Sequence, residues 1–170
     1  MPIEKKQDLL LKSLLKFYKD GENMKNMINI VTKKSNISLR VLDYLCTNYA
    51  KKNDIVYEIG TKKNPFNMFI NYRAQLKAYS KMQFDPFRRH NRIMIQVPKN
   101  IMEEGKIETT VAQLNFFKWA IENKVIDYLK SAKNLEKVEN AMTSNTTKKI
   151  SKSIPASTKR HNVHVTVTFK

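Results

Sequence analysis

The chain has 170 residues, enough for one domain with appendages, and its apolar share of 41% excludes a wholly disordered protein. Its formal net charge is +17, from 32 Lys and Arg against 15 Asp and Glu. A chain this basic repels itself when compact unless a polyanion lies nearby, so nucleic acid is the first expected partner, with an anionic membrane surface or an acidic protein next.

The N-terminal part predicts two helices. Residues 3–18 repeat apolar residues at three- and four-residue steps, which is typical of an amphipathic helix. Charges interrupt this segment throughout, so it is neither a signal peptide nor a membrane span. Asp20-Gly21 is expected to end it, and the spacing of Met24, Met27 and Val31 indicates a second helix. Residues 1–34 are therefore assigned to an N-terminal helical segment.

An α+β core is predicted at residues 35–142. Ser38 fits the N-cap of a helix near 39–51. Cys46 is the single cysteine, so no intrachain disulfide can form, which fits a reducing compartment. It falls on the apolar face of that helix and is expected to be a small core residue. "DIVYEIG" (54–60) and "RIMIQVP" (92–98) are strand-like. Asn64-Pro65 is expected to begin a helix that runs to about residue 82 and is ended by Asp85-Pro86.

The C-terminal third predicts a helix, a linker and a strand. Thr110 and Gln113 fit a capping box for a long helix that runs to about Met142. Residues 143–160, "TSNTTKKISKSIPASTKR", have eight Ser or Thr, five Lys or Arg and no acid, so a flexible basic linker is expected. Apolar residues alternate in 161–170, which predicts a strand that returns to the sheet or joins the sheet of another molecule. The expected fold class is α+β, with several helices packed on a small, mostly antiparallel sheet.

The strongest candidate site lies between residues 62 and 92, where eight cations face one acid, Asp85. Cations neutralise phosphates, and the aromatic residues between them can stack unpaired bases. Arg73, Lys77 and Lys81 recur every four residues and would share one helix face. The predicted nucleic-acid contacts of this region are Lys62, Lys63, Arg73, Lys77, Lys81, Arg88, Arg89 and Arg92.

A structural interpretation of the same residues stays open. The aromatic side chains fall at helical spacing, as core residues do, and the cations could be the solvated opposite face. Asp85 could pair with a neighbouring arginine. In "MQFDPFRRHNR" (82–92), Phe84 and Phe87 are expected to anchor a helix-to-strand connection that presents Arg88, Arg89 and Arg92.

The basic linker is the second candidate, because arms of this composition can follow a phosphate backbone. Its predicted contacts are Lys148, Lys149, Lys152, Lys159 and Arg160, and a plain linker or localisation patch is the alternative. His161 and His164 would point to opposite faces of a strand, so metal binding is not expected. The sequence has no Walker-type loop, no G-x-S-x-G elbow and no zinc-ligand spacing, so we expect no catalytic residue, metal or cofactor.

Three blocks and the C-terminal end together resemble a known class of proteins. The blocks are "ISLRVLDYLCTNYAKKN", "FNMFINYRAQLKAYSKMQFDPFRRHNRI" and "TTVAQLNFFKWAIENKVIDYL", and the end is "HVTVTFK". They are similar to small basic proteins of large nucleocytoplasmic (giant-type) DNA viruses. The resemblance implies a viral origin, a setting in the host cytoplasm (viral factory) or the virion, and an AT-rich genome that by itself favours lysine codons. It brings no catalytic residues.

Three functions remain as hypotheses. The first is a nucleic-acid-binding protein that contacts phosphates without catalysis, in genome or transcript handling or packaging. The second is a virion structural or assembly protein, a minor capsid or core component, whose basic face and C-terminal strand dock on protein partners. The third is an adaptor that captures an acidic host protein.

Overall fold

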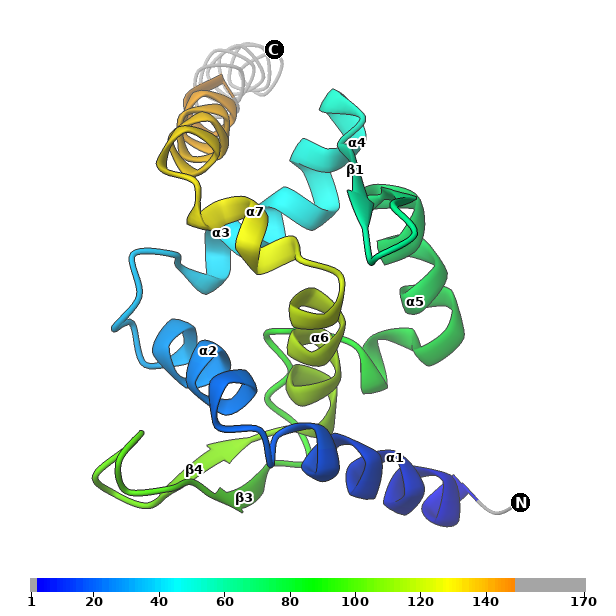
Figure 1. Ribbon diagram of the computed structural model, residues 1–170, viewed down its shortest axis with the longest axis vertical. Coiled ribbons are helices and arrows are strands. Elements are labelled where there is room, and N and C mark those ends of the chain that lie inside the picture. Colours follow the sequence, from blue (N-terminus) through cyan, green and yellow to red (C-terminus); the bar gives the residue numbers. More distant parts are fainter. Residues whose placement is uncertain (1–2, 149–170) are drawn as a thin grey trace, which may run out of the picture.

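The computed structural model describes residues 3–148, in which helices surround the central helix α6 (Val111–Glu122) (Figure 1). The elements that precede α6 are, in chain order, α1 (Ile3–Phe17), α2 (Gly21–Val31), α3 (Leu39–Tyr44), the π-helical η1 (Leu45–Tyr49), α4 (Ala50–Asn53), β1 (Val56–Ile59), β2 (Asn64–Asn67), α5 (Met68–Gln83), β3 (Ile93–Gln96) and β4 (Lys106–Thr109). After α6 come α7 (Val125–Lys130) and a helix at residues 132–148.

Helix α6 is buried on nearly every side, as expected for a helix whose apolar residues do not keep to one stripe. Helices α1, α2, α5 and α7 all pack against it. An aromatic cluster fills the space between α5 and α6: the rings of Tyr72, Phe84 and Phe116 each lie 5.7–5.9 Å, centroid to centroid, from the ring of Trp119. The core therefore centres on α6, and segments attached to α6 are held by the whole helical body.

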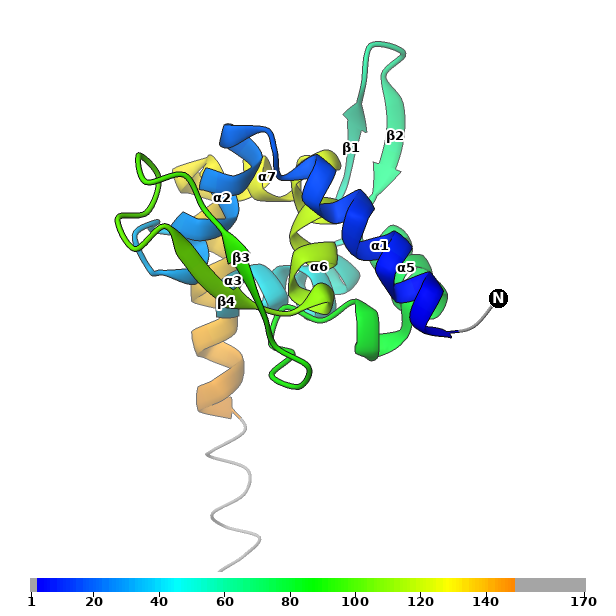
Figure 2. The same cartoon turned by 90° about the horizontal axis from the view of Figure 1, so that it is seen from below.

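The strands form two separate antiparallel hairpins rather than one sheet. Strand β1 pairs with β2, with Tyr57 opposite Phe66, and β3 pairs with β4, with Ile95 opposite Ile107. The β1–β2 hairpin projects from the body on one side, and β3–β4 lies beside α2 and α6 (Figure 2). The predicted α+β class is confirmed, but the prediction that the strands form one small sheet was wrong. The predicted C-terminal strand at 161–170 lies outside the described residues.

Several helix boundaries follow the predicted caps. The Oγ atom of Ser38 accepts a hydrogen bond from the Val41 amide at 3.1 Å, and the Oγ1 atom of Thr110 accepts one from the Gln113 amide at 3.1 Å. Helix α1 ends just before Asp20-Gly21, as predicted, and Asp20 also serves as the N-cap of α2. Cys46 is fully buried, as predicted.

No helix within residues 3–148 is long and apolar enough to cross a membrane.

The helix predicted to begin at Asn64-Pro65 begins later. Those residues belong to β2, and Asn67 is the N-cap, since its Oδ1 atom accepts a hydrogen bond from the Ile70 amide at 3.0 Å. Pro65 fits here because a two-stranded hairpin consists only of edge strands, where a missing amide hydrogen is tolerated.

The long helix predicted from Thr110 to Met142 is broken twice. Lys124 adopts a left-handed conformation (φ 59°) between α6 and α7, and Ser131 is extended (ψ 118°) between α7 and the next helix. That helix continues to residue 148, so the predicted linker does not begin at 143. Hydroxyl groups of this segment donate to carbonyls one turn earlier, as Thr143 does to Glu139 at 3.0 Å, which lets serine and threonine remain in a helix.

Candidate nucleic-acid interface

The predicted cationic segment "MQFDPFRRHNR" contains the connection between α5 and β3. We call residues 84–92 the corner. Phe84 anchors it, because this side chain is only 1% exposed and its ring lies within the aromatic cluster. Asp85 shapes the turn that follows: its Oδ1 atom accepts a hydrogen bond from the Phe87 amide at 2.9 Å. Asp85 therefore acts as a turn residue and forms no ion pair with a described arginine.

Helix α6 fixes the corner through its first turn. The Nε2 atom of Gln113 donates to the Pro86 carbonyl at 2.9 Å, and its Oε1 atom accepts from the Thr109 hydroxyl at 2.7 Å. The Asp85 amide donates to the Ala112 carbonyl at 3.3 Å. One turn of helix thus holds the loop by both side-chain and backbone bonds. The sequence marked Gln113 only as a capping residue, and its role in the corner was missed.

The three corner arginines differ in their surroundings. Arg92 lies 3.2 Å from the Glu108 carboxylate of β4 and donates from Nε to the Arg89 carbonyl at 3.1 Å. Arg88 and Arg89 form no ion pair with any residue from 3 to 148. Since an exposed ion pair contributes only about 0–1 kcal/mol, Arg92 is weakly held and can still meet an anion. Arg88 and Arg89 are the presented cations.

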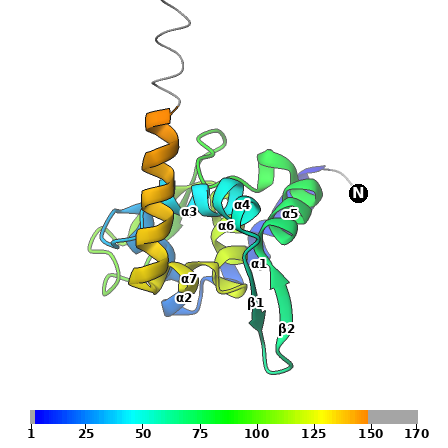
Figure 3. The same cartoon turned by 90° about the horizontal axis from the view of Figure 1, so that it is seen from above.

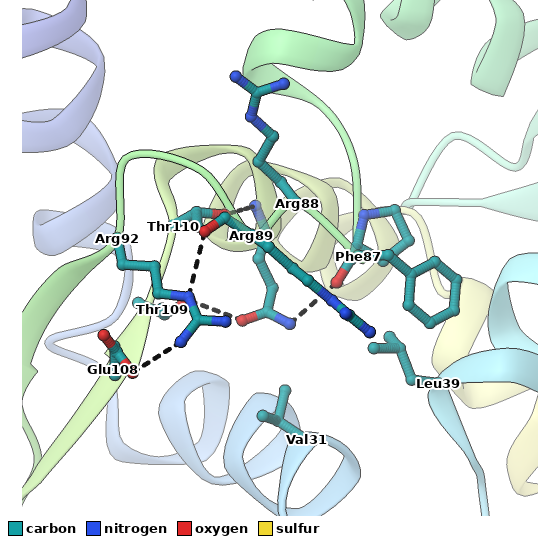
Figure 4. A pocket seen from close by; sticks show the side chains of 11 residues that line it. Val31, Leu39, Phe87, Arg88, Arg89, Arg92, Glu108, Thr109 and Thr110 are labelled. Carbon is teal, nitrogen blue, oxygen red and sulfur yellow. Dashed lines mark hydrogen bonds and ion pairs between the residues drawn. The ribbon is translucent and has the colours of Figure 1, made fainter.

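Phe87 was expected to anchor the corner, and that prediction was wrong. Its side chain is 46% exposed, whereas Phe84, three residues earlier, is buried. Phe87 lies at a pocket of about 300 Å³ whose apolar wall includes Val31 and Leu39 (Figure 4). Within this view Arg89 reaches toward Leu39 and Phe87, and Arg88, which also lines the pocket, extends in the opposite direction.

The cations of α5 form a different surface. Arg73 and Lys77 line a second, shallow pocket together with Phe69 and Ile70. The Phe69 ring has two cations over it, with the Lys51 Nζ atom at 5.7 Å and the Arg73 Cζ atom at 6.0 Å from its centroid. Phe69 is therefore not available as a bare stacking surface, and cation–π contacts occupy it.

Lys81 was predicted to share a helix face with Arg73 and Lys77, and that prediction was wrong. Ser80 has φ 58° and ψ 171°, a conformation outside the helical region, and it interrupts α5 one residue earlier. The charge of Lys81 acts on Asp43 instead. Burial, and then the charge of Asp85, raise the pKa of Asp43, and Lys81 opposes that rise.

Lys62 and Lys63 lie apart from the corner. They occupy the turn between β1 and β2, and this hairpin projects from the side of the molecule opposite to the corner and to the end of the 132–148 helix (Figures 2 and 3). The eight cations of the first candidate site therefore do not form one patch. In the second candidate site, Lys148 is the last described residue, and Lys149, Lys152, Lys159 and Arg160 lie outside the described residues.

Besides Asp43, the described groups whose pKa clearly departs from its usual value are four tyrosines and one thiol. Burial raises the pKa of Cys46 and of Tyr18 well above their usual range, and raises that of Tyr72 to about 12. Between residues 3 and 148, no group of three or more His, Cys, Asp or Glu side chains is placed to hold a metal ion.

Comparison with known proteins places the chain among viral sequences. Residues 3–167 match the family of unknown function DUF7197. The chain is 39% identical over 119 residues to uncharacterized protein L507 of Acanthamoeba polyphaga mimivirus. That alignment covers 66% of this chain and 45% of the mimivirus protein, so the chain spans less than half of its relative. No solved structure matches the chain. The likeness supports the giant-virus origin that the sequence implied.

Proposed function

The chain belongs to the DUF7197 family, and we propose that this giant-virus protein binds nucleic acid through its phosphates, without catalysis, in genome or transcript handling or packaging. The observation that carries the proposal is the corner. Arg88 and Arg89 have no acidic partner among residues 3–148, and the loop that bears them is fixed to α6. Cations held ready on a rigid frame suit phosphate contacts, which set the position of a nucleic acid.

The charge distribution supports the same proposal. Residues 149–170 hold five cations and no acid, and residues 1–148 keep 27 Lys and Arg against 15 Asp and Glu. The helix at 132–148 ends on the side of the molecule that carries the corner (Figures 2 and 3). The corner and the described end of this helix therefore lie on one side of the molecule, and we propose that a phosphate backbone runs along that side. The virus factory or the virion is the expected setting.

A salt titration tests the proposal. Affinity for labelled duplex DNA, single-stranded DNA and RNA is measured by fluorescence anisotropy between about 50 and 200 mM salt, and it should fall steeply as counter-ions compete. The double variant Arg88→Glu and Arg89→Glu should weaken binding and flatten the salt dependence. The matched control, Lys12→Glu and Lys16→Glu on α1, changes the net charge equally at two exposed lysines away from the corner.

The outcomes separate the corner from charge in general. An equal loss in both double variants would mean that net charge, and not the corner, governs binding. A loss confined to a chain truncated after residue 148 would assign binding to the C-terminal segment. Absence of binding to any nucleic acid at the lowest salt concentration would refute the proposal.

A virion structural or assembly role is the second candidate, and the α5 surface favours it. Ile70 is 66% exposed beside the cations around Phe69, so this face could dock on an acidic protein partner. Ile70→Glu should then weaken co-purification of a virion protein after nuclease treatment, while nucleic-acid affinity stays unchanged. A partner lost on nuclease treatment of the unmodified protein would speak against this role.

A further inference from the structure

The corner pocket has the lining of a site for a flat ring that carries a phosphate. Phe87 supplies an aromatic side chain that is nearly half exposed, and Val31 and Leu39 supply aliphatic surface from α2 and the start of α3. The volume of about 300 Å³ lies at the lower end of the range for small-molecule sites. A pocket of this size and lining admits one planar group rather than a folded chain.

Polar and charged groups lie at the same pocket. Arg89 and Arg92 line it, with Glu108 as the one acid, so its lining has a net positive charge. Gln113 and Thr109 also line it, and both are fixed by the hydrogen bond between them at 2.7 Å. The pocket thus combines an apolar wall that includes an aromatic ring with arginines that outnumber the one carboxylate (Figure 4). This combination suits a nucleotide, whose base would pack on the wall and whose phosphate would meet the arginines.

The base would have to be unpaired. In a duplex the faces of the bases are covered by their stacked neighbours, so a side chain at the wall of a pocket, such as Phe87, cannot reach them. A single strand leaves its base faces open to stack on aromatic side chains, at a gain that depends little on the base. The Phe87 ring is 46% exposed on a loop that hydrogen bonds fix, so it is accessible for stacking on such a face.

We propose that the corner pocket binds one unpaired nucleobase against Phe87, with Arg89 and Arg92 on the adjoining phosphate. The shared chemistry is that of a nucleotide, either within a single strand or free in solution. This inference rests on the proposed nucleic-acid binding and narrows it, because it predicts a preference for single strands over duplexes.

The test compares three labelled probes by fluorescence anisotropy: a short single strand, the matched duplex, and an abasic strand with the same phosphates and no bases. The unmodified protein should bind the single strand about 5- to 150-fold more tightly than the abasic strand, the range expected for stacking one base. Phe87→Ala should remove that difference, and Phe87→Trp should retain it. Leu9→Ala is the matched control, because Leu9 is an apolar side chain of similar exposure (54%) on α1.

A second variant tests the phosphate contact. Arg89→Ala should weaken binding of all three probes and lower the salt slope by about one phosphate contact. Adenosine monophosphate, added as a competitor, tells the two nucleotide sources apart: competition at micromolar concentration assigns the pocket to a free nucleotide, and competition only at millimolar concentration assigns it to a strand.

The results that overturn the inference differ from those that overturn the proposed function. If the single and abasic strands bind equally, or if Phe87→Ala binds the single strand as the unmodified protein does, the base pocket is refuted while phosphate binding stands. Tighter binding to the duplex than to the single strand also refutes it. If none of the probes binds, the proposed function itself fails.

Discussion

Phe84 and Phe87 provide a matched pair of substitutions for the architecture of the corner. The two residues have the same side chain and lie three positions apart, yet Phe84 is 1% exposed and Phe87 is 46% exposed. The Phe84 ring lies 5.5 Å from that of Phe116 and 5.7 Å from that of Trp119, so its removal leaves a cavity beside the aromatic cluster. Phe84→Ala should therefore lower the free energy of unfolding by about 3–5 kcal/mol.

Phe87→Ala should lower the free energy of unfolding by less than about 1 kcal/mol, as most surface substitutions do. With a urea dependence of about 2 kcal/mol per molar, Phe84→Ala would move the unfolding midpoint by about 2 M and Phe87→Ala by less than about 0.5 M. The chain has one tryptophan, Trp119, which contacts Phe84, so its fluorescence reports unfolding directly. Equal shifts for the two variants would refute the assignment of Phe84 as the anchor and Phe87 as the presented ring.

Three further predictions concern other parts of the fold. Ser80 lies in a region of φ and ψ that only glycine occupies readily, so Ser80→Gly should raise the free energy of unfolding by about 1 kcal/mol in urea melts, and a decrease would contradict the strain. Burial raises the pKa of Tyr18, so its contribution to stability is complete below pH ~10, the unfolded value, and is lost as pH rises further. Tyr18→Phe loses the 2.6 Å hydrogen bond to the Leu114 carbonyl, so it should lower the free energy of unfolding by about 1–2 kcal/mol at neutral pH. It should also lessen the loss of stability at alkaline pH, and an unchanged loss in melts above pH ~10 would exclude Tyr18 as its source. Cys46 is fully buried, so a thiol reagent should label it only in denaturant, and rapid labelling of the native protein would show that the core opens there.

The features that the sequence predicted well are those that depend on local signals. Ser38 and Thr110 cap helices as expected, because a cap depends on a side chain and an amide only three residues away. Cys46 was assigned to the core from its helical spacing, and it is fully buried. For the aromatic residues of α5 a core position was one of two open interpretations, and Tyr72, at 7% exposed, agrees with it, whereas Phe69 and Tyr79 are only partly buried. Periodicity and capping are properties of one short segment, so they can be read without knowledge of the fold.

The errors came from contacts between distant segments. Asn64-Pro65 is compatible with either a helix start or an edge strand, and the pairing of β2 with β1 decides for the strand. The break at Lys124 carries no glycine or proline, so nothing in the local sequence marks it. The same holds for the site: a hydrophobic residue in "FDPF" could face inward or outward, and only the position of α6 makes Phe84 inward and Phe87 outward. The pairing of Arg92 with Glu108 depends on the register of β3 and β4.

The hydrogen bonds between the corner and α6 also determine how the corner can open. Most loops exchange their amide hydrogens by small local fluctuations that leave the core intact. Here the Asp85 amide donates to the Ala112 carbonyl, and the Pro86 carbonyl accepts from Gln113, so the loop cannot swing free while the first turn of α6 remains in place. That turn belongs to α6, which carries more buried residues than any other helix of the described part. Opening of the corner should therefore carry a free energy close to that of global unfolding, and the loop backbone meets a ligand with little conformational entropy left to lose.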